Sequence, residues 1–131
     1  MDPALTVYQG GKTMYQQLNE SRLCVGTYNS TTDLETLSRN YPTVTFFNPK
    51  YFELRESAKP YFKKLCQVGI YHESPISAAL KVNEVYRDPT SWWNSSDIQE
   101  VREQFCRQFA WTKKNWIPEW KNRFKLLMKK Y

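Results

Sequence analysis

Apolar segments and segments with helical periodicity alternate along the first half of the chain. Residues 23–27 and 43–47 are rich in apolar, β-branched and aromatic side chains, which is typical of buried strands. Residues 32–39 lie between them and carry Leu34 and Leu37 on one face, which predicts a helix. Because two strands joined by a helix form a right-handed unit with a parallel pair, the pattern predicts an α/β fold.

The remaining pattern is mainly helical. It predicts helices over residues 13–21 and 57–68, from Ser74 to about Tyr86, from Ser96 onward and from Pro118 onward, with short extended runs at 5–8 and 70–71 and a loop at Trp92 and Trp93. Apolar residues predicted to face the core are Ile76, Ala79, Leu80, Val82 and Val85 in one helix, and Trp120, Phe124, Leu127 and Tyr131 in the last. We therefore expect two or three parallel strands, at least five helices and a helical C-terminal extension.

A hydroxyl-rich turn connects the first strand to the following helix. Its small polar residues are Thr27, Asn29, Ser30, Thr31 and Thr32. The free N–H groups and the positive dipole end of a helix start favour an anion, and Glu35 stands one turn further on, where a carboxylate accepts hydrogen bonds from sugar hydroxyls. The turn therefore predicts a nucleotide-binding site.

The same residues have a purely structural interpretation. Thr32 and Glu35 have the spacing of a capping box, in which the two side chains satisfy backbone donors reciprocally. Capping and ligand binding are compatible at one helix start, so both interpretations stay open.

Composition limits the chain to one small domain of 131 residues, with apolar runs too short to cross a bilayer and no signal peptide before them. The three cysteines are Cys24, Cys66 and Cys106. They are widely spaced and odd in number, which favours reduced thiols in the cytoplasm. With a single histidine and no paired cysteines, the sequence predicts no metal site.

His72 and the tryptophan pair are further candidates. His72 stands beside Glu73 near the end of the short strand, so a substrate contact is one interpretation and a structural role is the other. Trp92 and Trp93 either form the floor of an acceptor pocket or pack between helices.

The net charge of +6 comes from the C-terminal region: residues 101–131 hold nine Lys and Arg against two Asp and Glu. Together with Trp111, Trp116 and Trp120, this region suggests a second function, a non-enzymatic module that binds a partner or nucleic acid. The competing interpretation is a solvated lysine face and a buried Trp120.

Several motifs taken together resemble a known family. They are residues 27–35, Pro42 seven positions after Glu35, Gly69 with Ile70, and the segment from Trp92 to Phe105. The series resembles the C-terminal part of a bacterial family of transferases of surface-carbohydrate biosynthesis, with a GT-B-like glycosyltransferase fold. The resemblance extends from about Met14 to Trp120.

The resemblance implies that residues 1–131 are a single, partial Rossmann-like domain that binds a nucleotide-sugar donor. Ser30, Thr31 and Thr32 would contact the diphosphate and Glu35 the ribose. Such an enzyme also needs further strands and an acceptor-side domain, from which its general base usually comes, so the chain is expected to be a fragment without an assigned catalytic residue. We expect it to associate with the missing N-terminal half, or with itself through an open sheet edge. The absence of a G-x-G-x-x-G sequence argues against a classical NAD cofactor.

Overall fold

The computed structural model describes residues 6–112 and 114–129. Within them, three parallel strands lie in the order β1-β2-β3, namely β1 (Cys24–Gly26), β2 (Thr43–Phe46) and β3 (Tyr71–His72). Seven helices surround or extend this sheet: α1 (Met14–Asn19), α2 (Thr31–Ser38), α3 (Lys59–Gln67), α4 (Pro75–Val85), α5 (Pro89–Trp93), α6 (Ser96–Phe109) and α7 (Trp116–Met128). The predicted α/β fold is confirmed, and it corresponds to a partial Rossmann-like domain with a helical C-terminus.

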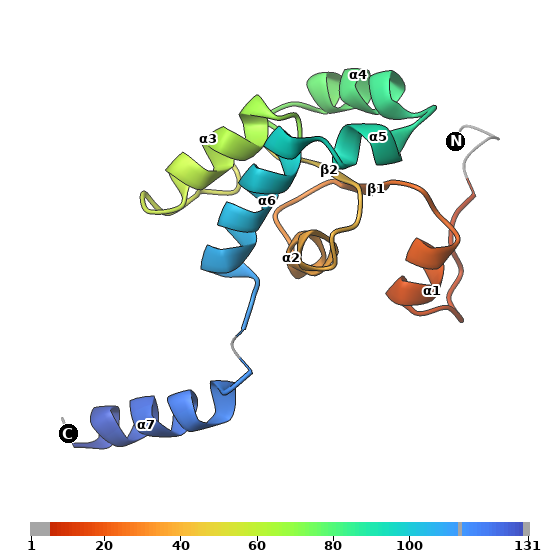
Figure 1. Ribbon diagram of the computed structural model, residues 1–131. Helices are drawn as coiled ribbons and strands as arrows, with labels where there is room; N and C mark the ends of the chain where they lie inside the picture. Colours follow the sequence, from red (N-terminus) through yellow and green to blue (C-terminus); the bar gives the residue numbers. More distant parts are fainter. Residues whose placement is uncertain (1–5, 113, 130–131) are drawn as a thin grey trace.

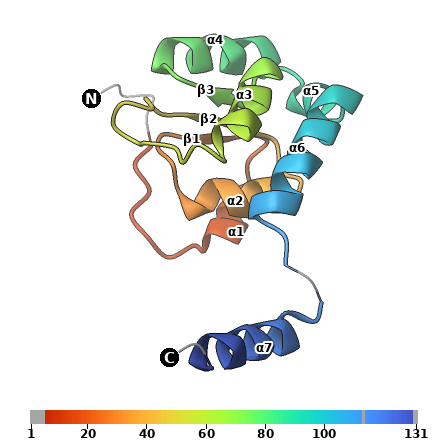
Figure 2. The same ribbon diagram turned by 90° about the vertical axis from the view of Figure 1, so that its left-hand side faces the viewer.

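Helices cover both faces of the sheet. Figures 1 and 2 show α4 above the strands and α2 below them, with α6 crossing beside α2. Because β2 is the central strand and is covered from both sides, Thr43, Val44 and Thr45 are all buried. The three-strand arrangement also brings the carboxyl ends of the strands to one edge.

The main core lies between the sheet, α3 and α6. Phe62 of α3 packs edge-on against Phe105 of α6 and against Tyr71 of β3, with ring centroids 5.4 and 5.2 Å apart. Trp93 is 2% exposed and belongs to the same core, where its indole N–H donates to the side-chain oxygen of Asn40 at 2.8 Å. Packing between helices, rather than the floor of a pocket, is thus the role of Trp93.

The first strand is less buried than its sequence suggests. β1 pairs only with β2 in the described sheet, and Val25 is 44% exposed. Within the described residues, β1 is therefore an edge strand. Self-association through this edge stays a prediction.

The loop expected at Trp92 and Trp93 was wrong. Trp92 and Trp93 end the short helix α5 instead of lying in a loop, because Pro89 starts this helix and the Asp88 carboxylate accepts from the Ser91 N–H. The helix expected from Ser96 onward is confirmed as α6; its N-cap residue is Ser95, and the Gln99 side-chain amide donates to the Trp93 carbonyl. Of the run expected at residues 5–8, Leu5 lies outside the described residues and residues 6–8 form no strand.

The buried face of α4 was only partly predicted: Val85 is buried as expected, but other residues of the expected face are not. Ile76 and Leu80 are 74% and 65% exposed, whereas Ala78 and Val85 face the sheet. The inward side also includes Lys81, whose alkyl chain packs against Gly69. Since α4 carries apolar residues on both sides, helical periodicity alone does not select the inner one.

The prediction that Trp120 of the last helix is a core residue was wrong. α7 begins at Trp116 and stands apart from the sheet in Figures 1 and 2, and no residue of it is buried. Trp120, Phe124 and Leu127 are 56%, 54% and 49% exposed, while Tyr131 lies outside the described residues.

Candidate functional site

The turn between β1 and α2 lies at the carboxyl edge of the sheet. Ser30 is the N-cap residue of α2 with an extended backbone, and Thr31 is the first helical residue. The turn residues are exposed or half-buried: Thr27, Asn29 and Thr31 are exposed, and Ser30 and Thr32 are half-buried. This is the edge at which ligands of parallel sheets bind.

These five side chains have no hydrogen-bond partner within residues 6–112 and 114–129. The first N–H groups of α2 likewise have no intrahelical acceptor, as at every helix start. The turn therefore presents both side-chain hydroxyls and backbone donors that the described structure does not use.

The predicted capping box is wrong. Thr32 is the second residue of α2 instead of its N-cap, and the actual N-cap, Ser30, makes no side-chain cap hydrogen bond. Glu35 does not reach back to the helix start; its carboxylate accepts from the Tyr15 hydroxyl at 3.3 Å. Thr32 and Glu35 therefore do not cap α2, and the ligand-binding interpretation of the turn stays a prediction.

The buried carboxylate of Asp33 lies beneath the turn. Asp33 is 7% exposed, and its Oδ2 atom accepts from the Thr45 hydroxyl at 3.0 Å, while the buried Oδ1 has no well-formed hydrogen bond. Burial raises the pKa of Asp33, an effect that the hydrogen bonds from Thr45 and the Ser30 backbone partly offset. Oδ1 lies against Gly26, where an added Cβ would approach it to 2.4 Å. Glycine at this position lets α2 begin directly over the end of β1.

Glu35 lies on the exposed side of α2 beside two residues that the sequence analysis did not select. Tyr15 donates its hydroxyl hydrogen bond to Glu35, and the Arg39 guanidinium lies 3.6 Å above the centroid of the Tyr15 ring. Tyr15 comes from α1, so no local pattern around Glu35 indicates this neighbour. The 3.3 Å bond is long and exposed, so Glu35 can exchange this partner for a ligand hydroxyl.

A large hollow lies at the same edge, beyond the ends of β2 and β3. Its volume is about 1210 Å3. Its lining combines an apolar floor with charged groups: Pro49, Lys50, Glu53, Leu54, Lys59, Pro60, Phe62, Lys63, Cys66, Gln67, Tyr71 and Glu73. Phe52, next to this lining in sequence, lies beside Tyr28 of the turn, with ring centroids 6.5 Å apart. The hollow and the turn are therefore neighbouring features of one edge.

The chemistry of the hollow favours binding over nucleophilic catalysis. Burial raises the pKa of the Cys66 thiol, so the thiol stays protonated at neutral pH. Burial also raises the pKa of Tyr71 to about 12, and its hydroxyl donates to the Phe47 carbonyl at 3.1 Å. Three lysines of this lining were not predicted: Lys59 and Lys63 lie one turn apart on α3, and the fold brings Lys50 of the preceding loop to the same hollow.

His72 is held within the fold. Its Nδ1 atom lies 3.2 Å from the Ser77 hydroxyl and its Nε2 atom 3.1 Å from the Gly69 carbonyl oxygen. Because a carbonyl only accepts, Nε2 carries the proton and Nδ1 accepts from Ser77. Burial lowers the pKa of His72, which favours this neutral form. A substrate contact by His72 stays a prediction, and it would have to replace one of these two bonds.

Comparison with known proteins places the chain in a family. A family model described as LIC12162 family transferase matches residues 2–124. The chain belongs to the LIC12162 family of transferases. No curated protein and no solved structure matches it. Membership in the LIC12162 family agrees with the transferase resemblance of the motifs. The matched residues include the turn, the residues that line the hollow and most of α7. Family membership does not identify the donor or the acceptor substrate.

The described residues also limit the kinds of site present. No group of three or more His, Cys, Asp or Glu among them is arranged to hold a metal ion. Among the same residues, no helix combines the length and the hydrophobicity needed to cross a bilayer.

Proposed function

We propose that this chain supplies the donor-binding part of a glycosyltransferase-like enzyme, which uses a nucleotide sugar in bacterial surface-polysaccharide biosynthesis in the cytoplasm. Ser30, Thr31 and Thr32 bind the diphosphate at the start of α2, with Thr27 and Asn29 at the rim, and Glu35 binds the ribose hydroxyls. The proposal rests on transferase family membership together with the resemblance of the turn to donor-binding motifs.

One structural observation carries the assignment to this turn. At this hydroxyl-rich helix start on the carboxyl edge of the sheet, the side chains make no hydrogen bond to any residue that the structure describes. A diphosphate has oxygen acceptors for both the hydroxyls and the first N–H groups of α2, and its charge is favoured by the helix dipole. A diphosphate therefore provides hydrogen-bond acceptors for donors that have none within the described structure.

Asp33 is a carboxylate directly beneath the start of α2, where a negative charge opposes an anion. It is 7% exposed, and burial raises its pKa. Its hydrogen bond to Thr45 keeps one carboxylate oxygen occupied within the fold. Asp33 thus shapes the turn and is not a ligand contact in this proposal.

The chain binds the donor and does not complete the reaction. Glycosyl transfer breaks the bond between the sugar and the nucleoside diphosphate, and the acceptor must lose a proton. The described residues at this edge stabilise the departing diphosphate, whereas the general base comes from the acceptor-side domain. The isolated chain is accordingly expected to bind a donor weakly and to lack transferase activity.

Substitutions of two glutamates and one lysine test the location of the nucleotide site. We expect Glu35→Gln to weaken binding of a nucleoside diphosphate in equilibrium dialysis, because an amide accepts hydrogen bonds from ribose less strongly than a carboxylate does. Glu84→Gln, an exposed substitution on α4, is the matched control and should leave binding unchanged. Loss of binding in Lys63→Gln with full binding in Glu35→Gln would assign the nucleotide to the hollow instead of the turn.

A further inference from the structure

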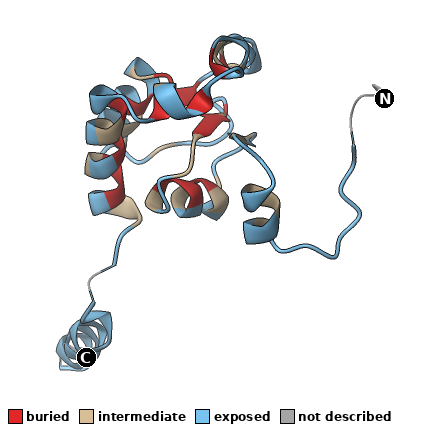
Figure 3. Ribbon diagram, turned by 45° about the vertical axis from the view of Figure 1, so that its right-hand side comes forward, coloured by how far each residue is buried: buried red, intermediate tan, exposed pale blue. Residues whose placement is uncertain are grey.

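The exposed helix α7 carries most of its apolar side chains on one side. At about 100° per residue, one arc of about 120° contains Trp116, Ile117, Trp120, Phe124, Leu127 and Met128. Every one of these residues is exposed, from Ile117 and Leu127 at 49% to Met128 at 78%. Leu126 lies outside the arc. Figure 3 shows α7 in the colour of exposed residues, in contrast to the buried inner side of α6.

Cations border the apolar arc on both sides. Arg123 lies next to one border and Lys121 next to the other, while Lys125 and Lys129 continue around the polar side. Glu119 is the single acidic residue of α7. The basic excess of the whole chain lies in this region, since residues 1–100 hold ten Lys and Arg against eleven Asp and Glu. The helix therefore combines an apolar side with a locally positive charge.

The aromatic residues form a continuous surface along the helix. The rings of Trp120 and Phe124 lie 5.4 Å apart between centroids and are inclined by 32°. No other helix or strand in the described part of the chain packs extensively against α7. The apolar arc thus needs an occupant outside the described structure.

We propose that α7 binds the surface of an anionic lipid bilayer, lying in the interface with its apolar arc among the acyl chains. Trp and Phe are suited to the boundary between headgroups and acyl chains, and long cations at both borders of the arc reach back to lipid phosphates. Charge complementarity selects anionic over neutral lipid. This binding is independent of the nucleotide site and would hold the transferase at a membrane surface.

The arc is less suited to nucleic acid or to a protein groove. Bases stack on aromatic rings, but Ile117, Leu127 and Met128 share the arc and offer no stacking surface, whereas hydrocarbon accepts both kinds of side chain. A helix in a protein groove typically uses a narrow set of anchors at helical spacing. An arc of this width, with cations on both sides, fits a flat surface better.

Vesicle flotation of the full chain tests the proposal. We expect flotation with vesicles of mixed phosphatidylcholine and phosphatidylglycerol and much less with phosphatidylcholine alone. Phe124→Glu should abolish flotation, because it places a charge in the centre of the arc. Lys121→Gln combined with Lys125→Gln should lower the partition coefficient about 25-fold, at about fivefold for each cation near the surface.

Matched controls lie on α4 and just after it. Leu80→Glu replaces an exposed leucine and Arg87→Gln an exposed cation outside α7, and both variants should float like the parent chain. Absence of flotation of the parent chain, or equal flotation of Phe124→Glu, would overturn the proposal. Tighter binding to a single-stranded oligonucleotide than to mixed vesicles, or an α7-dependent dimer that does not float, would also overturn it in favour of those occupants.

Discussion

The starts of α2 and α4 have similar sequences but use their hydroxyl groups differently. Each helix begins after a parallel strand and has a serine at the N-cap, Ser30 in α2 and Ser74 in α4. At α4 the Ser74 hydroxyl accepts from the Ser77 N–H at 3.2 Å, and Ser77 lies against His72. At α2 the corresponding hydroxyl has no such bond. A capping sequence therefore does not establish that capping occurs, and an unused cap at a sheet edge is available to a ligand.

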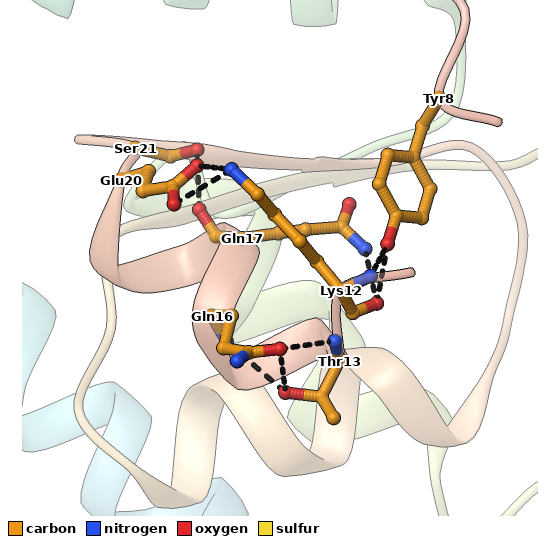
Figure 4. A network of polar contacts seen from close by, with 7 residues as sticks. All are labelled: Tyr8, Lys12, Thr13, Gln16, Gln17, Glu20 and Ser21. Carbon is orange, nitrogen blue, oxygen red and sulfur yellow. Dashed lines mark hydrogen bonds and ion pairs between the residues drawn. The ribbon is translucent and has the colours of Figure 1, made fainter. Parts of the chain in front are cut away.

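The starts of α1 and α6 provide two further cases, one with a complete capping box and one without a side-chain cap bond. Figure 4 shows the complete capping box of α1, in which the Gln16 N–H donates to the Thr13 hydroxyl and the Thr13 N–H donates to the Gln16 side chain. α6 also lacks a side-chain cap bond at Ser95, but it follows α5 instead of a strand. The unused cap and the position at the carboxyl edge of the sheet occur together at α2.

The largest predicted effect concerns the support beneath α2. Gly26→Ala should lower the free energy of unfolding by about 2 kcal/mol, because the new Cβ would meet Asp33 Oδ1 at 2.4 Å and Thr45 Oγ1 at 2.8 Å. Urea unfolding measures the loss. Asp33→Ala in the same chain should restore part of it by removing the nearest atom. An unaltered stability in Gly26→Ala would mean that α2 does not begin as close to β1 as described.

The two N-cap serines should differ in their contribution to stability. Ser74→Ala should lower the free energy of unfolding by about 1 kcal/mol, since the Ser77 N–H loses its acceptor. Ser30→Ala should change it by less than about 0.5 kcal/mol, as expected for a half-buried side chain that makes no hydrogen bond within the described residues. Thermal unfolding of the two variants gives this comparison directly. Equal losses would show that Ser30 does cap α2 and would remove the main argument for a ligand there.

The smallest predicted effect is the pH dependence that arises at the start of α4. His72 is a base whose pKa is lowered in the folded chain, so below its unfolded value of 6.5 the unfolded chain binds the proton first. Stability should therefore fall as the pH decreases from 6.5 through the lowered folded pKa. His72→Gln should remove this part of the slope in urea midpoints measured across that range. A slope unchanged by the substitution would assign the dependence to other groups.

The sequence predicted the strands and the parallel connection because the apolar runs are short and the helical segment between them is amphipathic. It predicted the inner face of α4 only in part: Val85 is buried as expected, but Ile76 and Leu80 are exposed and Ala78 is buried in their place. Neither did it predict that Trp120 is exposed, since a stripe that faces the core and a stripe that faces outward have the same periodicity. These choices depend on contacts with distant elements, which a local pattern does not contain.

The candidate site was only partly predictable for the same reason. The hydroxyl-rich turn is contiguous in sequence, so its residues were found together, and the error lay in giving Thr32 and Glu35 a capping role. Asp33 was not selected although it lies within the turn segment, because its burial depends on Gly26 and Thr45. Tyr15 and the lysines of the hollow reach the site only through the fold.

The most direct measurement of the central claim is a titration of the isotope-labelled chain with a nucleoside diphosphate, followed by amide NMR signals. Binding at the start of α2 predicts that the signals of Asn29 to Glu35 shift first, and that the shifts become weaker in Glu35→Gln while the stability stays nearly unchanged. The amides of Ile76 to Ala78 at the capped start of α4 are the internal control and should not move. If millimolar nucleotide leaves every signal of the turn in place, the donor site does not lie at α2 in this chain, and the proposal is wrong.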